Sequence, residues 1–258
     1  MKNVKTVILL TVFIFMLSGI SFARETVCDA GGVFASLKSQ RITDDVLVLM
    51  YHKLSDNKEE WGDYCMSPQQ FEKELLNLKN ENYVFYTASE LLSAKPEKGK
   101  RIVVITFDDG YESDYIHVLP LLKKHNAKAT FFVFGQAIGT DGYMSETQLK
   151  ALSDEECTEI GNHTYNLHGE TPEYITKLYS TLKNINTIEN DFKTNSDFIE
   201  KITGKKVTAA SYPYGIYNSA VDLRLKGNGI KITFSSDSKV NNLSDISHPL
   251  GRINKVSK

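Results

Sequence analysis

Ile102-Val103-Val104-Ile105-Thr106-Phe107-Asp108-Asp109-Gly110 stands near the middle of this 258-residue chain. Its first four residues are β-branched and apolar, as expected of a strand buried on both faces. Two carboxylates follow at the C-terminal end of that strand, and Gly110 permits a sharp turn after them. Catalytic groups of α/β proteins gather at the C-terminal ends of parallel strands. Asp108 and Asp109 are therefore candidate catalytic residues, although they could equally cap the next helix.

The sequence on both sides of this segment alternates between strand and helix patterns. Apolar runs predict strands at 46–51, 83–86, 129–134, 207–211 and 230–234. A hydroxyl cap followed by Glu or Gln at the third residue predicts a helix after each of Ser67, Thr87 and Ser145. The helix after Thr87 is expected to continue from Leu91 onwards. Helical spacing from Tyr179 to Phe192 predicts a long helix that ends near Gly204. This alternation predicts an α/β fold with a mainly parallel sheet, either covered on both faces or closed into a barrel.

The N-terminus has the pattern of a secretory signal. Lys2 and Lys5 precede an apolar run, and Ser21-Phe22-Ala23 places small residues at the cleavage positions. We expect a signal peptide at 1–23, a linker at 24–43 and one domain at 44–258, and hence a secreted or cell-envelope protein; an uncleaved membrane anchor is the alternative. Cleavage would remove two of 30 basic residues and none of 32 acidic ones, which moves the formal charge from −2 to −4. Nothing in this balance suggests a nucleic-acid partner.

A second cluster, Asn162-His163-Thr164-Tyr165-Asn166-Leu167-His168, contains two of the six histidines. Residues five apart lie about 140° apart on a helix and on opposite faces of a strand, so this is not the helical metalloprotease spacing of four, but a strand end plus a loop could bring them together. Two imidazoles and one carboxylate suit Zn²⁺, or Co²⁺, Ni²⁺ or Mn²⁺, and leave a coordination position open. Either histidine could instead be an ordinary loop residue. A third cluster, Ser211-Tyr212-Pro213-Tyr214-Gly215, by itself indicates only a turn.

These three clusters, in this order, resemble the polysaccharide deacetylase family, the NodB-homology domain of carbohydrate esterase family 4. The resemblance spans Val46 to Arg252 and includes Leu49-Met50-Tyr51-His52, Leu119-Pro120-Leu121-Leu122-Lys123 and Ala129-Thr130-Phe131-Phe132-Val133. It implies a distorted (β/α) barrel in which parallel strands are surrounded by helices. It also implies specific roles for side chains: Asp109, His163 and His168 as metal ligands, Asp108 as general base, the backbone N–H of Tyr214 as oxyanion donor, and Tyr212, Pro213 and Tyr214 as substrate contacts.

The chain departs from the family pattern at three points. Its metal histidines are five residues apart instead of four, a spacing that resembles the branch acting on poly-N-acetylglucosamine. Ser211 and Tyr212 stand where many members have an arginine that orients the general base, so Arg252 is the substitute candidate. His248 is the candidate proton donor to the leaving amine, with a plain surface histidine as the equal alternative. His52 is given no catalytic role.

The resemblance implies a monomeric, metal-dependent N-deacetylase whose substrate is an N-acetylglucosamine polymer, either peptidoglycan or an exopolysaccharide. Two other functions remain open. The same metal and base would serve an O-acetyl esterase acting on xylan-like chains. A sugar-binding protein without turnover would keep the fold, but it would not need all four of Asp108, Asp109, His163 and His168.

Overall fold

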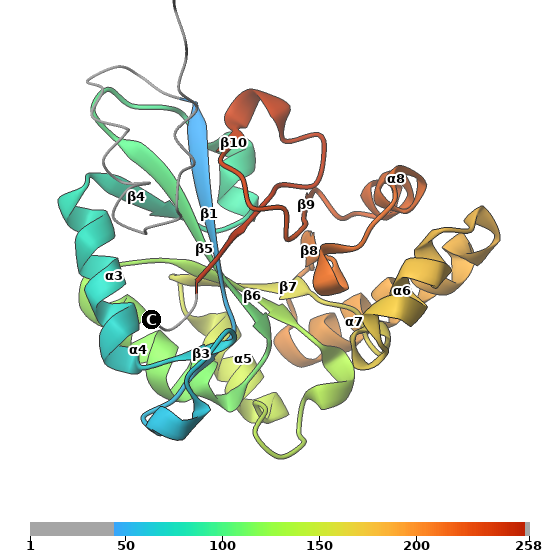
Figure 1. Ribbon diagram of the computed structural model, residues 1–258, viewed down its shortest axis with the longest axis horizontal. Helices are drawn as coiled ribbons and strands as arrows, with labels where there is room; N and C mark the ends of the chain where they lie inside the picture. The colour runs from blue at the N-terminus through green and yellow to red at the C-terminus, as the bar shows by residue number, and fades with distance from the viewer. Residues whose placement is uncertain (1–43, 256–258) are drawn as a thin grey trace, which may run out of the picture. The chain divides into compact units, whose positions relative to one another are not determined.

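The computed structural model describes residues 44–255 (Figure 1). The expected signal peptide at 1–23 and linker at 24–43 lie outside the described residues. None of the helices within 44–255 is long and apolar enough to cross a membrane.

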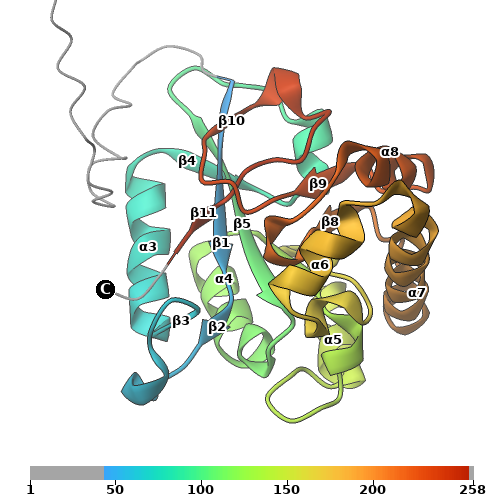
Figure 2. The same ribbon diagram turned by 45° about the vertical axis from the view of Figure 1, so that its right-hand side comes forward.

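A curled sheet of parallel strands forms the centre of the domain (Figures 1 and 2). Its main run of neighbouring strands comprises β1 (Asp45–Tyr51), β5 (Arg101–Asp109), β6 (Ala129–Val133), β7 (Thr158–Asn162), β8 (Ala209–Ser211) and β9 (Ile232–Phe234). On the same side of β5, β4 (Tyr83–Tyr86) pairs with its first half and β6 with its second half. The predicted α/β barrel with parallel strands is therefore confirmed.

The C-terminal segment brings the two ends of this sheet together. Leu250 forms a parallel bridge with Phe234 of β9, and β11 (Ile253–Asn254) then runs parallel to β1, with Ile253 opposite Leu49. On the same edge of β1, β10 (Asn241–Asn242) pairs antiparallel with its first residues. Arg252 thus lies between the two pairings that join β9 to β1.

Side chains along each strand point alternately to the two faces of the sheet and form one apolar layer on each face. Tyr51, Phe107 and Phe131 stack on one another along the outer face, with ring centroids 5.2 and 5.5 Å apart, and Phe71 of α3 (Pro68–Asn80) packs edge-on against the first two. The inner face packs Val48, Val104, Phe132 and Phe234 into the barrel interior. Residues 108 and 132 are paired in register, so Asp108 continues the inward-facing row of β5.

Helix starts follow the capping pattern at two of the three expected positions. Capping boxes begin α3 at Ser67 and α5 (Glu146–Asp154) at Ser145, as predicted. The helix expected from Leu91 onwards is wrong, because Ser89–Ser93 forms only a short 3₁₀ helix, η2. Glu90 does accept the Thr87 N–H, but Pro96 follows closely and disfavours helical backbone at the residue before it.

The long helix expected from Tyr179 is also corrected. Tyr179 ends α6 (Pro172–Tyr179), and α7 (Ile185–Thr203) is a separate helix that begins after the short 3₁₀ helix η6 (Leu182–Asn184). Thr181 is extended at the break. The predicted end is confirmed, since Gly204 takes the left-handed conformation at the end of α7. Two more helices, α4 (Leu119–His125) and α8 (Ser219–Gly227), complete the outer layer.

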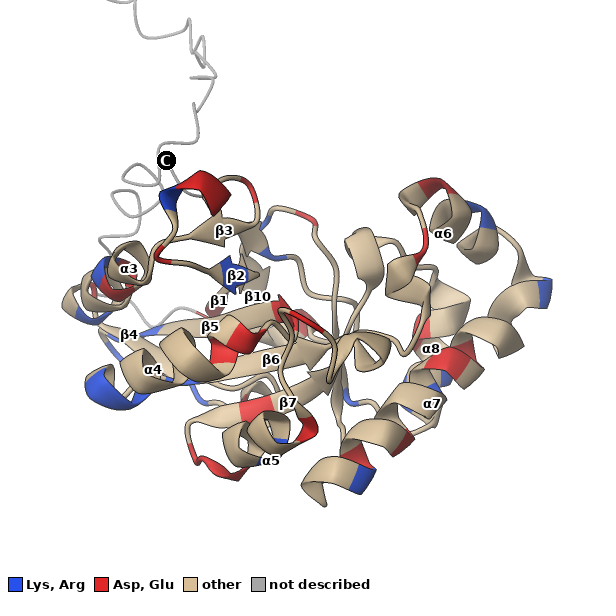
Figure 3. Ribbon diagram, turned by 90° about the horizontal axis from the view of Figure 1, so that it is seen from below, with Lys and Arg blue, Asp and Glu red and all other residues tan. Residues whose placement is uncertain are grey.

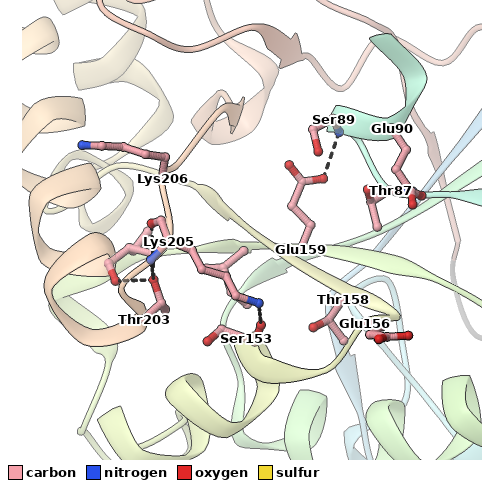
Figure 4. Close-up of a pocket in the computed structure, with 12 residues that line it drawn as sticks. Thr87, Ser89, Glu90, Ser153, Glu156, Thr158, Glu159, Thr203, Lys205 and Lys206 are labelled. Atoms are coloured by element: carbon pink, nitrogen blue, oxygen red, sulfur yellow. Dashed lines mark hydrogen bonds between the residues drawn. The ribbon is translucent and has the colours of Figure 1, made fainter. Parts of the chain in front are cut away.

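A polar pocket of about 270 Å³ lies beside the N-terminal end of β7, the end opposite the histidines (Figure 4). Glu159 accepts hydrogen bonds from the Ser89 N–H at 2.9 Å and from the Thr130 hydroxyl at 3.2 Å, and the Lys205 ammonium donates to the Ser153 carbonyl. Burial raises the pKa of Glu159. These bonds tie η2 to β7 and the residues after α7 to α5, so the pocket walls stabilise the fold.

Candidate active site

The end of β5 sends its two carboxylates in different directions. Asp109 has a φ of +79°, a conformation that costs free energy for any residue other than glycine, and Gly110 follows with a φ of +83°. Because the backbone turns at this point, Asp108 stays inside the barrel while Asp109 reaches the loops beyond β7. The two adjacent carboxylates therefore face different partners, Arg252 for Asp108 and His168 for Asp109.

Asp108 forms a bidentate ion pair with Arg252. The two guanidinium nitrogens donate to its two carboxylate oxygens at 2.6 and 2.7 Å, and the side chains are 2% and 1% exposed. The remaining donors of Arg252 reach the Ser211 hydroxyl at 2.8 Å, the Ser235 carbonyl at 2.9 Å and the Thr106 hydroxyl at 3.2 Å. Arg252, from the end of the chain, therefore orients Asp108 in the way that the departure at Ser211-Tyr212 led us to expect of a substitute arginine.

The charge of Asp108 is fixed by this pair. Burial alone would favour the neutral acid, but the attraction of the Arg252 guanidinium and of His163 outweighs it and holds the pKa of Asp108 well below its usual range. The carboxylate is therefore ionised at any pH near neutrality. It presents a fixed, desolvated proton acceptor at the mouth of the barrel.

Asp109, His163 and His168 form the only group of three potential metal-ligating residues of this kind within residues 44–255, with ligand atoms all within 4.8 Å of one another. The His168 Nε2 lies 2.8 Å and the His163 Nε2 3.6 Å from the same Asp109 oxygen. That oxygen is buried and has no well-aligned hydrogen-bond partner in the described part of the chain. Three converging nitrogen and oxygen atoms around an unsatisfied oxygen fit a tetrahedral divalent ion with one open position.

The protonation of His163 suits this role. The His163 Nδ1 lies 2.9 Å from the Ser211 carbonyl, which can only accept, so the proton sits on Nδ1 and Nε2 keeps its lone pair for a metal. Burial lowers the pKa of His163 to about 4, so the ring is neutral at neutral pH. For Asp109 and His168, burial opposes charge, but their mutual attraction prevails: the pKa of Asp109 falls below and that of His168 rises above its ordinary value.

Two buried amides and a half-buried carboxylate hold the loop that joins the two histidines. Asn162 accepts the Thr164 N–H at 2.8 Å and the Asn195 amide at 2.9 Å, and Asn195 also donates to the Val133 carbonyl. Asp191 of α7 accepts the N–H of Tyr165 at 2.8 Å. The loop therefore leaves the strand at Asn162 and returns His168 to His163, with ring centroids 4.6 Å apart, as the spacing of five requires.

The turn after β8 carries Tyr214 to the rim of the site. Tyr214 has a φ of +56°, its ring lies 5.2 Å from that of His168, and its hydroxyl donates to the Glu170 carbonyl at 2.8 Å. A side chain at Gly215 would collide with Ser236, which donates to the Tyr214 carbonyl. The turn is thus locked with its exposed aromatic ring beside the candidate metal ligand His168.

The structure corrects the expectation that Tyr212 and Pro213 contact substrate. Tyr212 is fully buried, and its hydroxyl donates to Asp222 of α8 at 2.8 Å. Pro213 is also buried. Their side chains hold the turn against the outer helices, because an apolar ring at this position gains more from the core than from the surface.

The structure does not bring His248 to the site. It is exposed and follows the short helix η8 (Leu243–Asp245), which hydrogen-bonds to Asp44 at the N-terminal end of β1. His52, in contrast, leaves β1 directly after Tyr51, which is paired with Phe107, so it emerges beside Asp108. Its position after a predicted strand was visible in the sequence, but that signal alone did not separate it from a core histidine.

The comparisons with known proteins agree with this geometry. The family model for polysaccharide deacetylases matches residues 95–233, more than half of the chain. The chain belongs to the polysaccharide deacetylase family. It is accordingly a hydrolase of the class that cleaves carbon–nitrogen bonds other than peptide bonds, a family that generally depends on a metal.

Relatives of this deacetylase include a poly-beta-1,6-N-acetyl-D-glucosamine N-deacetylase from Staphylococcus epidermidis, 27% identical over 216 residues that cover 76% of this chain and 74% of the relative. One of the same name from Staphylococcus aureus is 29% identical over 216 residues, covering 76% and 73%. Among solved structures, IcaB from Ammonifex degensii is similar with a TM-score of 0.71 and 27% identity, covering 83% of this chain and 92% of that one.

Asp114 is a buried carboxyl that the sequence analysis did not single out. It begins the π-helical turn η3 (Asp114–Val118), is fully buried, and neither oxygen has a hydrogen-bond partner within the described residues. Burial, and after it the charges of Asp109 and Asp108, raise its pKa well above the usual value. A group whose pKa is raised on folding favours the folded state at low pH, and that advantage is lost as the pH rises.

We expect Asp114→Asn to stabilise the deacetylase at pH 8 by about 1–3 kcal/mol, because the amide cannot ionise in this desolvated place. The measurement is the melting temperature of both proteins between pH 4 and pH 9. The melting temperature of the variant should rise steadily relative to that of the wild type as the pH increases. Parallel curves across this range would show that Asp114 is not the group that titrates.

Proposed function

We propose that this deacetylase removes acetyl groups from the N-acetylglucosamine units of a β-1,6-linked exopolysaccharide. The observation that carries the proposal is the pairing of a desolvated, ionised Asp108 with the converging ligand atoms of Asp109, His163 and His168. The printed names of the staphylococcal relatives support the choice of polymer. We also propose that the signal-like N-terminus exports the enzyme.

The charge around the mouth agrees with a neutral or cationic polymer. The loops that follow β1, β5, β6 and β7 carry more acidic than basic side chains, and Figure 3 shows this end of the barrel with its acidic segments gathered around the strand ends. Such a rim repels polyanions and tolerates the free amines that deacetylation leaves behind.

Each site residue has a task in this proposal. A divalent ion held by Asp109, His163 and His168, with Zn²⁺ the expected occupant, would supply Lewis acidity to the acetyl carbonyl and to water. Asp108 accepts the proton of the attacking water, and Arg252 keeps that carboxylate charged and correctly oriented. The N–H of Tyr214 donates to the developing oxyanion. His52, beside Asp108, is the nearest candidate to return a proton to the leaving amine.

Chelation and substrate choice test the proposal together. Purified enzyme should release amines from poly-β-1,6-N-acetylglucosamine, lose at least about 100-fold in rate after exhaustive chelation, and recover with added Zn²⁺ or Co²⁺. Acetate release from acetylated xylan, measured side by side, should be much slower. Full activity after chelation would refute the metal assignment, and a preference for xylan would make the protein an O-acetyl esterase instead.

A further inference from the structure

Tyr64 is a large aromatic side chain exposed at the mouth of the barrel without an assigned role. It is 62% exposed, and its ring lies 4.8 Å from that of His52, nearly perpendicular to it. The His52 ring in turn stands beside Asp108 at the end of β1. A tyrosine at this exposure offers most of its ring to whatever occupies the mouth.

The loop that carries Tyr64 is firmly held. The Tyr64 carbonyl accepts the N–H of Lys53 in β2 (Lys53–Leu54), and the next residue begins β3 (Cys65–Met66), which pairs with β2. The Trp61 indole donates to the Ser55 carbonyl at 2.8 Å across the same loop. The ring is therefore presented on an ordered support, which reduces the entropy lost when a ligand packs against it.

Tyr214 faces the same mouth from the other side. It follows β8, whereas Tyr64 follows β1, and these strands lie on different sides of β5 in the sheet. Tyr214 is 42% exposed. The two exposed rings therefore stand at the same end of the barrel, with β5, β6 and β7 between the strands that carry them.

We propose that Tyr64 and Tyr214 form two sugar-binding platforms, one on either side of the metal-ligating residues, so that the enzyme deacetylates units inside a chain. The C–H face of a pyranose ring is apolar and packs on an aromatic ring, while the Tyr64 hydroxyl stays with water or sugar hydroxyls and the Tyr214 hydroxyl keeps its bond to the Glu170 carbonyl. One platform stacks on the unit before, and the other on the unit after, the unit that loses its acetyl group. A single sugar therefore fills only the centre of the site.

The choice of substrate rests on the proposed function, but binding to an inactive variant tests the platforms separately from the deacetylase activity. Calorimetry with β-1,6-linked N-acetylglucosamine oligomers of two to five units measures binding to the metal-loaded Asp108→Asn protein, where no turnover is needed. Combining Tyr64→Ala with it should weaken pentamer binding about tenfold and dimer binding much less, whereas Tyr64→Phe should restore most of the affinity. Equal losses at every length, or none, would overturn the platform role.

Kinetics of the Asp108-containing enzyme give the second measurement. Tyr64→Ala should raise KM for the pentamer about tenfold and leave kcat and the pH profile unchanged, because the ring binds remote sugar. A fall in kcat on all lengths with a shifted pH profile would mean that Tyr64 acts by positioning His52, which contradicts the proposal. Leu223→Ala, on the outer side of α8 and 73% exposed, is the matched control and should change neither constant.

Discussion

Asp108→Asn is expected to slow deacetylation by about 10²–10⁴-fold while the protein still takes up its metal. The asparagine has the same shape as the aspartate but cannot accept a proton from the attacking water. Asp108 contributes nothing to the ligand group formed by Asp109, His163 and His168, so metal content should be unaffected. The measurements are amine release from the polymer and metal content of the purified variant by elemental analysis.

The neighbouring substitution supplies the control. Asp109→Asn removes a ligand oxygen from the same turn and should lose both metal and activity. If Asp108→Asn also lost its metal, or if Asp109→Asn kept it, the division of roles between the two carboxylates would be wrong. Far-ultraviolet circular dichroism of both variants shows whether either loss comes from unfolding.

Arg252→Met is expected to cost about 3–5 kcal/mol of folding free energy, because it leaves the Asp108 carboxylate buried without its partner. Burial then acts on Asp108 without the guanidinium, and the pKa of the carboxyl rises. In the wild type, the depressed pKa of Asp108 stabilises the folded state at every pH above the usual pKa of an aspartate, and this stabilisation is lost only in strong acid. In the variant, the raised pKa has the opposite effect, and the free energy of unfolding falls as the pH rises. Denaturant unfolding at pH 5 and pH 8 should show the gap between the two proteins widening at pH 8.

The double variant Asp108→Leu with Arg252→Met tests the cause. Replacing both members of a buried ion pair with apolar side chains of similar size should recover most of the lost stability, but no activity. If the double variant stays as unstable as Arg252→Met, the arginine acts through its bonds to Ser211 and Ser235 and not through the charge of Asp108. Retained activity in Arg252→Met would remove Arg252 from the chemistry, and retained activity in the double variant would remove both residues.

Much of the fold was visible in local patterns. The β-branched run at 102–105 and the capping boxes at Ser67 and Ser145 each depend on a few adjacent residues, and each produced the expected element. The expectations were wrong where the end of a helix depends on residues outside the local pattern. The break between Tyr179 and Ile185 keeps helical spacing of apolar residues on both sides, so the pattern could not reveal that the chain turns there.

The site divides in a similar way. Asp108, Asp109, His163 and His168 belong to short motifs, and the resemblance assigned them together. The partner of Asp108 could only be guessed, because Arg252 lies 144 residues away and reaches it through the closing of the barrel. Tyr212 was misjudged because a turn motif does not say which of its rings faces the core. The candidate roles of His52 and Tyr64 depend on neighbours from other strands and loops, so no local motif could indicate them.

The join between β9 and β1 has a consequence for how this enzyme becomes active. The three metal-ligating side chains lie between residues 109 and 168, but the countercharge of the general base arrives with the segment that bridges the last strand to the first. The candidate metal ligands and the countercharge of Asp108 therefore come from segments far apart in the sequence, and the charge compensation of Asp108 depends on closure of the barrel between β9 and β1.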